Sequence, residues 1–192
     1  THSRMVVDLN RPSDNAPLYP GQASTGLVPL TLFDGTPAWT HPPAPADVAG
    51  RIEAIWEPYH RALRAALNAA KARHGFAILW DAHSIRSRVP RLFDGQLPDL
   101  NLGTNAGTSC APALRALTAR LLDAHAPGVD PTRGFSHVVD GRFRGGFITR
   151  HYGQPAVGVH ALQLEMAQRT YLDEGAAVPA PYDRARAAPL VG

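Results

Sequence analysis

Three short clusters of polar residues carry the side chains best suited to chemistry in this sequence. Asp81-Ala82-His83-Ser84 and Gln163-Leu164-Glu165 each close an apolar run, and Asp8-Leu9-Asn10-Arg11 follows a third run near the start of the chain. A histidine can bind zinc while a neighbouring carboxylate fixes its ring and tautomer. A glutamate can take a proton from metal-bound water and return it to a leaving amine. These residue types favour a metal-assisted hydrolase.

The third cluster suits the recognition of an acidic substrate. An Asn-Arg pair such as Asn10-Arg11 can hold a carboxylate by charge-assisted hydrogen bonds. If the three clusters follow strands of one α/β sheet, they meet at the same edge of that sheet, where binding sites gather. Each cluster taken alone also has a structural explanation: Asp81 as a cap, Glu165 as the start of a helix, Arg11 as a surface residue. Their combination is therefore more informative than any single member.

The other reactive side chains have weaker sequence contexts. Cys110 is the only cysteine, which excludes an intrachain disulfide and a Cys-rich zinc site, and we expect it to pack in the core. His151, beside Arg150, is a candidate substrate contact, and His137 and His160 lie nearer the expected edge of the sheet. The remaining histidines of the loops and helices are expected to be structural or solvated: His41, His60, His74 and His125.

The elements that position these clusters follow from hydrophobic periodicity. Apolar residues recur every three or four positions over 47–74, which predicts an amphipathic helix that Pro58 kinks or splits and Gly75 ends. The pattern predicts a buried strand over 76–80 and a second helix over 111–125, capped by Thr108 or Ser109.

The two ends of the chain complete the expected sheet. Residues 5–9 read as the end of a buried strand, and 156–165 read as one or two strands, with a helix continuing from Glu165 to Tyr171. Alternation places Gln163 and Glu165 on one face of that strand. Strands alternating with helices indicate an α/β sandwich with a mixed or parallel sheet. The Pro- and Gly-rich residues 12–45 predict a long ordered loop that packs on the core.

Composition bounds the class of protein. The 192 residues suit a single domain over 1–192, with 44% hydrophobic and 18% charged residues. The formal charge is +3, and Lys71 is the single Lys. The arginines are scattered, so we expect no nucleic-acid partner. No apolar run is long enough to cross a bilayer, so we expect a cytoplasmic protein without a membrane partner. Small anionic substrates remain compatible.

Five motifs in order give the chain a family resemblance. They are Val7-Asp8-Leu9-Asn10-Arg11-Pro12, Trp80-Asp81-Ala82-His83-Ser84, Asn101-Leu102-Gly103-Thr104, Gly145 through Gly153, and His160 through Met166. Together they resemble the N-formylglutamate amidohydrolase family, as far as about Tyr171. The resemblance implies an α/β three-layer sandwich with a mixed, largely parallel sheet, related to zinc carboxypeptidases, aspartoacylase and succinylglutamate desuccinylase. It also implies hydrolysis of N-formyl-L-glutamate to formate and L-glutamate, a step of histidine degradation.

The resemblance also implies roles for individual residues. His83 would bind Zn²⁺, although another divalent metal stays open, and Glu165 would be the general base and acid. Asn10 and Arg11 match the pair that binds the substrate carboxylate in the related fold. Arg150 is the next candidate for a carboxylate contact or for polarising the formyl oxygen. Arg144 is a further candidate.

The sequence departs from the family at its start. Family members carry an earlier Pro-His-Ser-Gly segment and an acidic residue that supply further metal ligands. His2 does not replace them, so we expect an N-terminally incomplete domain that alone binds zinc poorly and is nearly inactive. Two other functions stay open: a deacylase of another N-acyl amino acid, and a non-catalytic binding module. The oligomeric state is not predicted.

Overall fold

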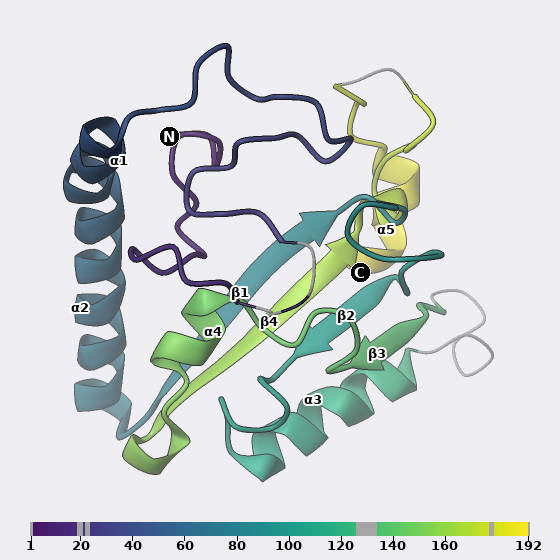
Figure 1. Cartoon of the computed structure of the whole chain (residues 1–192). Coiled ribbons are helices and arrows are strands. Elements are labelled where there is room, and N and C mark those ends of the chain that lie inside the picture. Colours follow the sequence, from purple (N-terminus) through teal and green to yellow (C-terminus); the bar gives the residue numbers. More distant parts are fainter. Residues whose placement is uncertain (1, 19–20, 22–23, 126–133, 177–178, 192) are drawn as a thin grey trace.

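A four-stranded mixed sheet forms the centre of the protein (Figure 1). The computed structural model describes residues 2–18, 21, 24–125, 134–176 and 179–191. The strands are β1 (Ala77–Ile85), β2 (Leu100–Gly103), β3 (His137–Val139) and β4 (Val159–Ala167), in the order β1-β4-β2-β3. The pairs β1–β4 and β2–β3 are parallel, and β2–β4 is antiparallel. The expectation of a mixed, largely parallel sheet is confirmed.

A long helical segment covers one face of β1. It consists of α1 (Pro45–Arg51), a π-helical stretch over Ile52–Trp56 and α2 (Glu57–His74). Pro58 follows the π-helical stretch directly and has no N–H to donate within the continuous helical segment, so the hydrogen-bonding pattern changes beside it; Gly75 ends the helix at φ 79°. Leu67 packs with Ala77, Ile148 and Tyr152 in a core cluster beneath the helix. The predicted helix is therefore present, divided next to Pro58.

The opposite face of the sheet is covered by α3 (Pro112–Ala124). Leu114 and Leu122 of this helix pack on Leu102 of β2 and Leu162 of β4, together with Cys110. Two short elements lie between β3 and β4, namely α4 (Phe147–Tyr152) and a 3₁₀ turn (Pro155–Val157). A 3₁₀ turn (Gln168–Thr170) and α5 (Arg184–Val191) follow β4. Helices on both faces of the sheet make the three layers.

Three expectations about the elements are wrong. Residues 5–9 form no strand: residues 4–6 are a turn, and the Asp8 N–H donates to Leu27 O of the long loop, not to a strand. The region after Glu165 forms no α-helix, because β4 continues to Ala167 and keeps its pairing with β1. The start of α3 is capped by neither Thr108 nor Ser109; its N-cap is Ala111, whose N–H donates to His160 Nδ1 at 3.2 Å.

The Pro- and Gly-rich residues 12–45 form a long connection over the carboxyl ends of β1 and β4 (Figure 1). Residues 19–20 and 22–23 of this connection lie outside the described residues. Leu18 and Leu27 are buried, whereas Leu30, Leu32 and Phe33 are exposed. The loop is therefore ordered in its described parts and packs on the core through some of its apolar residues.

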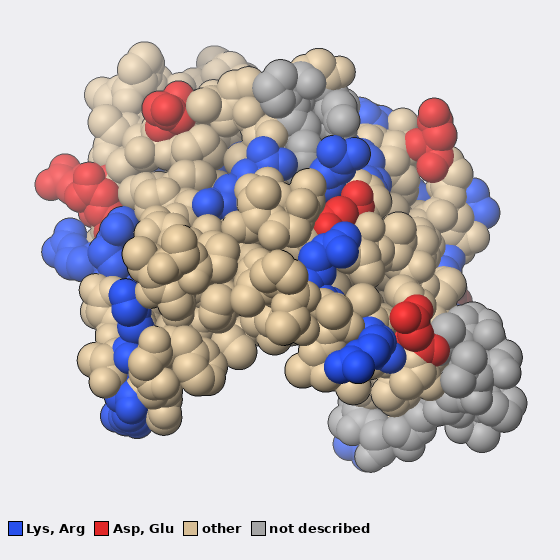
Figure 2. Space-filling model, turned by 90° about the horizontal axis from the view of Figure 1, so that it is seen from below, with Lys and Arg blue, Asp and Glu red and all other residues tan. Residues whose placement is uncertain are grey.

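Charged residues are dispersed over the surface. Figure 2 shows basic side chains separated by uncharged surface and interspersed with acidic ones on the face seen from below. Across the described residues, every helix is too short or too polar to cross a membrane.

Candidate active site

The pairing of β1 with β4 brings two of the predicted site residues together. His83 is directly opposite Glu165 in the parallel register, and Asp81 is opposite Gln163. Side chains at paired positions point to the same face of a sheet. Ala82 and Leu164 occupy the paired positions between them and point to the other face. The alternation predicted for Gln163 and Glu165 is thus confirmed, and it places them beside Asp81 and His83.

The orientation of the His83 ring is set by Asp81. The Asp81 Oδ1 lies 2.8 Å from His83 Nε2, and the Asp81 side chain is mostly buried. Because a carboxylate only accepts hydrogen bonds, this contact fixes the proton on Nε2. No hydrogen bond from a described residue reaches Nδ1, so this nitrogen is the one available for a metal.

The backbone of Glu165 is held from the neighbouring strand. Asn101 of β2 is opposite Glu165 in the antiparallel register, and its side-chain amide donates to Glu165 O at 3.0 Å and to Pro98 O at 2.9 Å. Asn101 is 1% exposed, so these bonds are shielded from water. The Asn-Leu-Gly-Thr motif therefore supports the position of Glu165, a role that sequence reasoning had not assigned.

The surroundings shift the pKa values of both site residues. Burial raises the pKa of Glu165 to about 7, against the opposing effect of the His83 and Arg4 charges. Burial lowers the pKa of His83, but the hydrogen bond and charge of Asp81, together with the charge of Glu165, outweigh it, so the net shift is upward. A carboxyl group that titrates near neutral pH suits both uptake and return of a proton.

Asn10 packs against His83 instead of standing free in the pocket. Its Oδ1 accepts a hydrogen bond from the Ile148 N–H at 2.8 Å, which fixes the orientation of the carboxamide. Its Nδ2 then lies 3.0 Å from His83 Nε2 and 3.4 Å from Asp81 Oδ2. Since Nε2 already carries a proton, the carboxylate is the acceptor for this amide. Asn10 therefore supports the His83–Asp81 pair.

The Asn10 carboxamide packs directly against the backbone of Gly146. A Cβ at position 146 would lie 2.4 Å from both Oδ1 and Nδ2 of Asn10. The Gly146 N–H donates to Gln163 Oε1 at 2.7 Å. The Gly-Gly sequence before α4 thus lets the backbone approach Asn10 and Gln163 more closely than any side chain would permit.

Asp8 holds two arginines at the same pocket. The carboxylate is 4% exposed, and its Oδ2 lies 2.5 Å from Arg4 Nη2 and 3.7 Å from Arg11 Nη1. The Arg11 guanidinium also donates to Thr25 O, Thr25 Oγ1 and Asn10 O. Arg4 keeps 47% of its side chain exposed, so it has room to contact a ligand. Sequence reasoning had missed Arg4, although its spacing of four residues from Asp8 was a signal for an ion pair.

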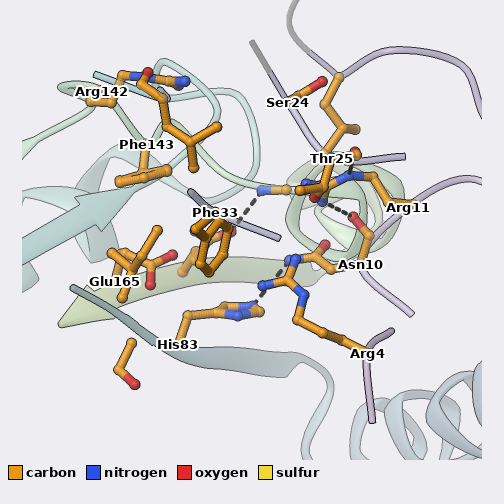
Figure 3. Close-up of a pocket in the computed structure, with 16 residues that line it drawn as sticks. Arg4, Asn10, Arg11, Ser24, Thr25, Phe33, His83, Arg142, Phe143 and Glu165 are labelled. Carbon is orange, nitrogen blue, oxygen red and sulfur yellow. Dashed lines mark hydrogen bonds between the residues drawn. The ribbon is translucent and has the colours of Figure 1, made fainter. Parts of the chain in front are cut away.

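These side chains line one pocket (Figure 3). It encloses about 660 Å³ of space, part of which is open to solvent. His83 and Glu165 line it from the sheet, with Arg4, Asn10 and Arg11 on another side. Figure 3 shows Arg4 reaching toward His83 and Asn10. The long loop and the segment before α4 complete the lining with Phe33, Arg142 and Phe143. Among the described lining residues, Arg4, Arg11 and Arg142 are basic and Glu165 is acidic.

Three further sequence candidates lie outside this described lining. The Arg150 guanidinium donates to Gly145 O at 3.0 Å and to Leu18 O at 2.7 Å, which ties α4 to the long loop. The Arg144 side chain is exposed, and its carbonyl accepts from the Asn105 N–H. His151 stacks on Phe147 and lies 3.4 Å from Arg64. Their substrate contacts stay predictions.

The described residues do not form a complete metal site. Among them, no group of three or more His, Cys, Asp or Glu side chains is placed to hold an ion. A catalytic zinc ordinarily takes three protein ligands. His83 offers one oriented nitrogen, and Asp81 is the hydrogen-bond partner behind it. The donor set therefore fits part of a zinc site and not the whole of one.

Two buried groups outside the pocket have structural roles. His60, 3% exposed, lies between Leu9 O and the Tyr152 hydroxyl, at 3.0 and 2.8 Å. Burial lowers its pKa to about 4, so it is neutral at pH 7. Cys110 is 1% exposed in the cluster under α3, and burial raises the pKa of its thiol, which favours the packing role over a nucleophilic one.

Comparisons of the sequence with known proteins find relatives in one enzyme family. The family model of N-formylglutamate amidohydrolase matches residues 1–172. An N-formylglutamate deformylase of Pseudomonas aeruginosa is 56% identical over 177 residues, covering 91% of this chain and 64% of the relative. One from Pseudomonas putida is 53% identical over 175 residues, covering 90% and 62%. The chain thus spans less than two thirds of either relative.

A solved structure shares the fold. The crystal structure of an N-formylglutamate amidohydrolase from Ralstonia eutropha JMP134 superposes with a TM-score of 0.75 at 26% identity. The match covers 97% of this chain and 68% of that one. The three-layer architecture described above is therefore that of a known amidohydrolase.

Proposed function

Since this chain belongs to the N-formylglutamate amidohydrolase family, we propose that it supplies the residues that transfer protons and bind the substrate in an enzyme that hydrolyses N-formyl-L-glutamate to formate and L-glutamate. The observation that carries the proposal is the pairing of His83 with Glu165 across β1 and β4, with Asp81 fixing the tautomer of His83. The histidine-degradation route is the proposed source of the substrate.

Glu165 is the residue that moves the proton. Its carboxylate takes a proton from the water that attacks the formyl carbon and returns it to the amine of the departing glutamate. Its pKa of about 7 leaves both protonation states populated at neutral pH. Asn101 holds the backbone of Glu165 from β2, so the carboxylate keeps its position through both transfers.

Arginines of the pocket bind the carboxylates of the substrate. Arg4 and Arg11 share the buried Asp8 carboxylate, and this pairing holds both guanidinium groups beside the pocket. N-formylglutamate carries two carboxylates, and Arg binds a carboxylate through parallel N–H bonds. Arg4 has the more exposed guanidinium and is the first candidate. Asn10, Arg11, Arg150 and Arg144 remain proposed contacts from the sequence.

Zinc remains part of the proposal, with His83 Nδ1 as one ligand and the other ligands from outside the described residues. His83 is suited to this role because its Nε2 is committed to Asp81. A chain that supplies one ligand binds the ion weakly. We therefore expect the enzyme's full activity only where the remaining ligands are present.

The two other functions open at the sequence level make different predictions in one assay. Formate or acyl release is measured with N-formyl-L-glutamate, N-acetyl-L-glutamate and N-formyl-L-leucine, each with added zinc, alongside binding of each compound by calorimetry. The proposal requires formate release from the first compound above the other two. Faster hydrolysis of the acetyl compound would favour another deacylase. Binding of the formyl compound without turnover, under conditions that complete the metal site, would favour a binding module.

A further inference from the structure

The helical segment over 45–74 holds the backbone of residues 6–11. Three of its side chains each donate a hydrogen bond to a carbonyl of these residues. The pairs are Arg51 Nη1 with Val6 O at 2.9 Å, Trp56 Nε1 with Arg11 O at 2.9 Å, and His60 Nε2 with Leu9 O at 3.0 Å. A carbonyl only accepts hydrogen bonds, so the His60 ring carries its proton on Nε2. We name residues 6–11 the pocket segment and the three side chains the helix donors. Figure 1 shows this segment, in purple, beside the helical column of α1 and α2.

The π-helical stretch explains how the three helix donors reach the same segment. Trp56 and His60 are four residues apart, a spacing that places two side chains on one face of an α-helix. Arg51 and Trp56 are five residues apart, and an α-helix would turn the second side chain about 140° away from the first. In the π-helical stretch the Glu57 N–H donates to Ile52 O, five residues back, so one extra residue is taken up in a single turn. Arg51 therefore lies in line with the other two donors.

The pocket segment needs such contacts because the sheet does not hold it. Within the described residues, it pairs with no strand. It carries Asn10 and Arg11, which line the pocket, and Asp8, which pairs with Arg4 and Arg11. Two of the carbonyls that the helix donors bind, those of Leu9 and Arg11, lie on either side of Asn10 in the chain. The backbone that directs Asn10 and Arg11 into the pocket is therefore fixed at both of its ends.

Helix α4 supports the same arrangement. The Tyr152 hydroxyl lies 2.8 Å from His60 Nδ1, and the Ile148 N–H donates to Asn10 Oδ1 at 2.8 Å. The Trp56 and His60 rings are 4.0 Å apart between centroids. His60 is 3% exposed, so its bond to the pocket segment is shielded from competition by water. The helix donors thus belong to a packed layer between α2 and α4, and their geometry is defined before any ligand binds.

We propose that the helix donors are positioning residues for substrate binding. They act through the carbonyls of the pocket segment and set where Asn10 and Arg11 enter the pocket. None of the three is among the described residues that line the pocket, so their effect on a ligand passes through this segment. Loss of one donor is expected to weaken binding of the substrate carboxylates and to leave proton transfer by Glu165 intact. The effect on substrate rests on the proposed function, whereas the anchoring of the segment does not.

Amide hydrogen exchange tests the anchoring without any ligand. Trp56→Phe removes the indole N–H and keeps an aromatic ring beside His60. Trp39→Phe is the matched control, because Trp39 Nε1 donates to Pro29 O at 2.8 Å, a bond of the same kind within the long loop. Exchange is followed in the peptide over 6–11, where four amides are hydrogen-bonded, those of Val6, Asp8, Asn10 and Arg11. We expect it to be roughly threefold to tenfold faster in Trp56→Phe and unchanged in Trp39→Phe.

Binding of N-formyl-L-glutamate, measured by calorimetry, tests the positioning role. Arg51→Met removes the donor to Val6 O, whereas Arg51→Lys keeps an N–H at the end of a long side chain. We expect Kd to rise roughly threefold to tenfold in Trp56→Phe and Arg51→Met, and to stay within about twofold of wild type in Arg51→Lys and Trp39→Phe. Where turnover is measured, under conditions that complete the metal site, KM should rise by the same factor and kcat should stay unchanged.

Each outcome decides one part of the proposal, with circular dichroism to confirm that each variant is folded. Unchanged exchange in both Trp56→Phe and Arg51→Met would overturn the anchoring. Equal effects of Trp56→Phe and Trp39→Phe on exchange and on Kd would overturn it as well, since they would show a general loss of stability. Faster exchange of the pocket segment with unchanged Kd and KM would overturn the positioning role. Expected exchange in a wild type that binds no N-formyl-L-glutamate, with the metal site complete, would instead contradict the proposed function and leave the anchoring in place.

Discussion

His83 and Glu165 lie opposite each other on adjacent parallel strands and point to the same face of the sheet. This relationship makes their separation a property of the β1–β4 register and not of loop conformation. A one-residue slip in that register would move one of the two side chains to the other face. The hydrogen bonds of the sheet therefore hold the proposed metal ligand and the proposed base together.

Asp81 is expected to control the tautomer of His83. Asp81→Asn keeps the size of the side chain but removes the negative charge and replaces one acceptor oxygen by an amide donor, so the side chain no longer fixes the proton on Nε2. Loss of such a partner typically lowers metal affinity or activity by roughly 10- to 100-fold. Zinc titration and formate release measure the effect, with the exposed Asp94→Asn as control. Values within twofold of wild type would show that Asp81 does not set the tautomer.

Arg4 is expected to bind a substrate carboxylate. Arg4→Gln should raise KM roughly tenfold or more, because a hydrogen bond to a charged group contributes about 1.5–3 kcal/mol. Arg120→Gln on the exposed side of α3 is the control and should leave KM unchanged. Arg144→Gln and Arg150→Gln, measured in parallel, test the two arginines chosen from the sequence. An unchanged KM for Arg4→Gln would remove Arg4 from the substrate site.

Gly146 is expected to tolerate no side chain. The Cβ of Gly146→Ala would occupy the place of the Asn10 carboxamide, and its displacement would leave the buried Ile148 N–H without its acceptor. We expect a loss of about 1–3 kcal/mol in the free energy of unfolding, measured with urea. Gly50→Ala is the matched control, because no atom lies within 4 Å of its added Cβ. Equal stabilities for the two variants would contradict the close packing at Gly146.

His60 is expected to make the fold sensitive to acid. The pKa of His60 falls from its ordinary 6.5 to about 4 in the folded chain, chiefly because the ring is buried. Above pH 6.5 the ring is neutral in both states and its contribution is constant. Between pH 6.5 and 4 the unfolded chain binds a proton that the folded chain does not, so the free energy of unfolding falls, by about 3 kcal/mol in total.

Comparison of two variants isolates this contribution from other titrating groups. His60→Gln does not titrate, so its unfolding free energy should fall less steeply than that of wild type over the same pH range. His41→Gln, at an exposed position, should keep the wild-type slope. The same slope in wild type and His60→Gln would refute the assignment.

The sequence predicted those parts of the fold that depend on local pattern. The helix over 47–74 and the alternation in β4 follow from side-chain periodicity, and both are present. The polar Asp81 and His83 were interpreted as residues beyond a strand, yet they lie within β1, because alternate positions of that strand face the pocket. The short strands β2 and β3 carry too few residues for a period to appear.

The candidate site was predicted in its components but not in its arrangement. The predicted substrate contact of Asn10 stays a prediction, since Asn10 lines the pocket; its packing against Asp81, His83 and Ile148 was not predicted. Arg4 enters the pocket through its ion pair with Asp8, and Asn101 supports Glu165 from another strand. These relationships depend on contacts between segments that are distant in sequence, so local pattern does not reveal them.

Formate release by wild type and Glu165→Gln is the most direct test of the proposed catalytic role. The substrate is N-formyl-L-glutamate, and the assay contains zinc under conditions that complete the metal site. Glu165→Gln preserves the shape of the side chain and removes its ability to take a proton. We expect turnover by wild type and at least about a hundredfold loss in the variant, with unchanged zinc content and fold. Comparable turnover by the two proteins would show that Glu165 is not the base.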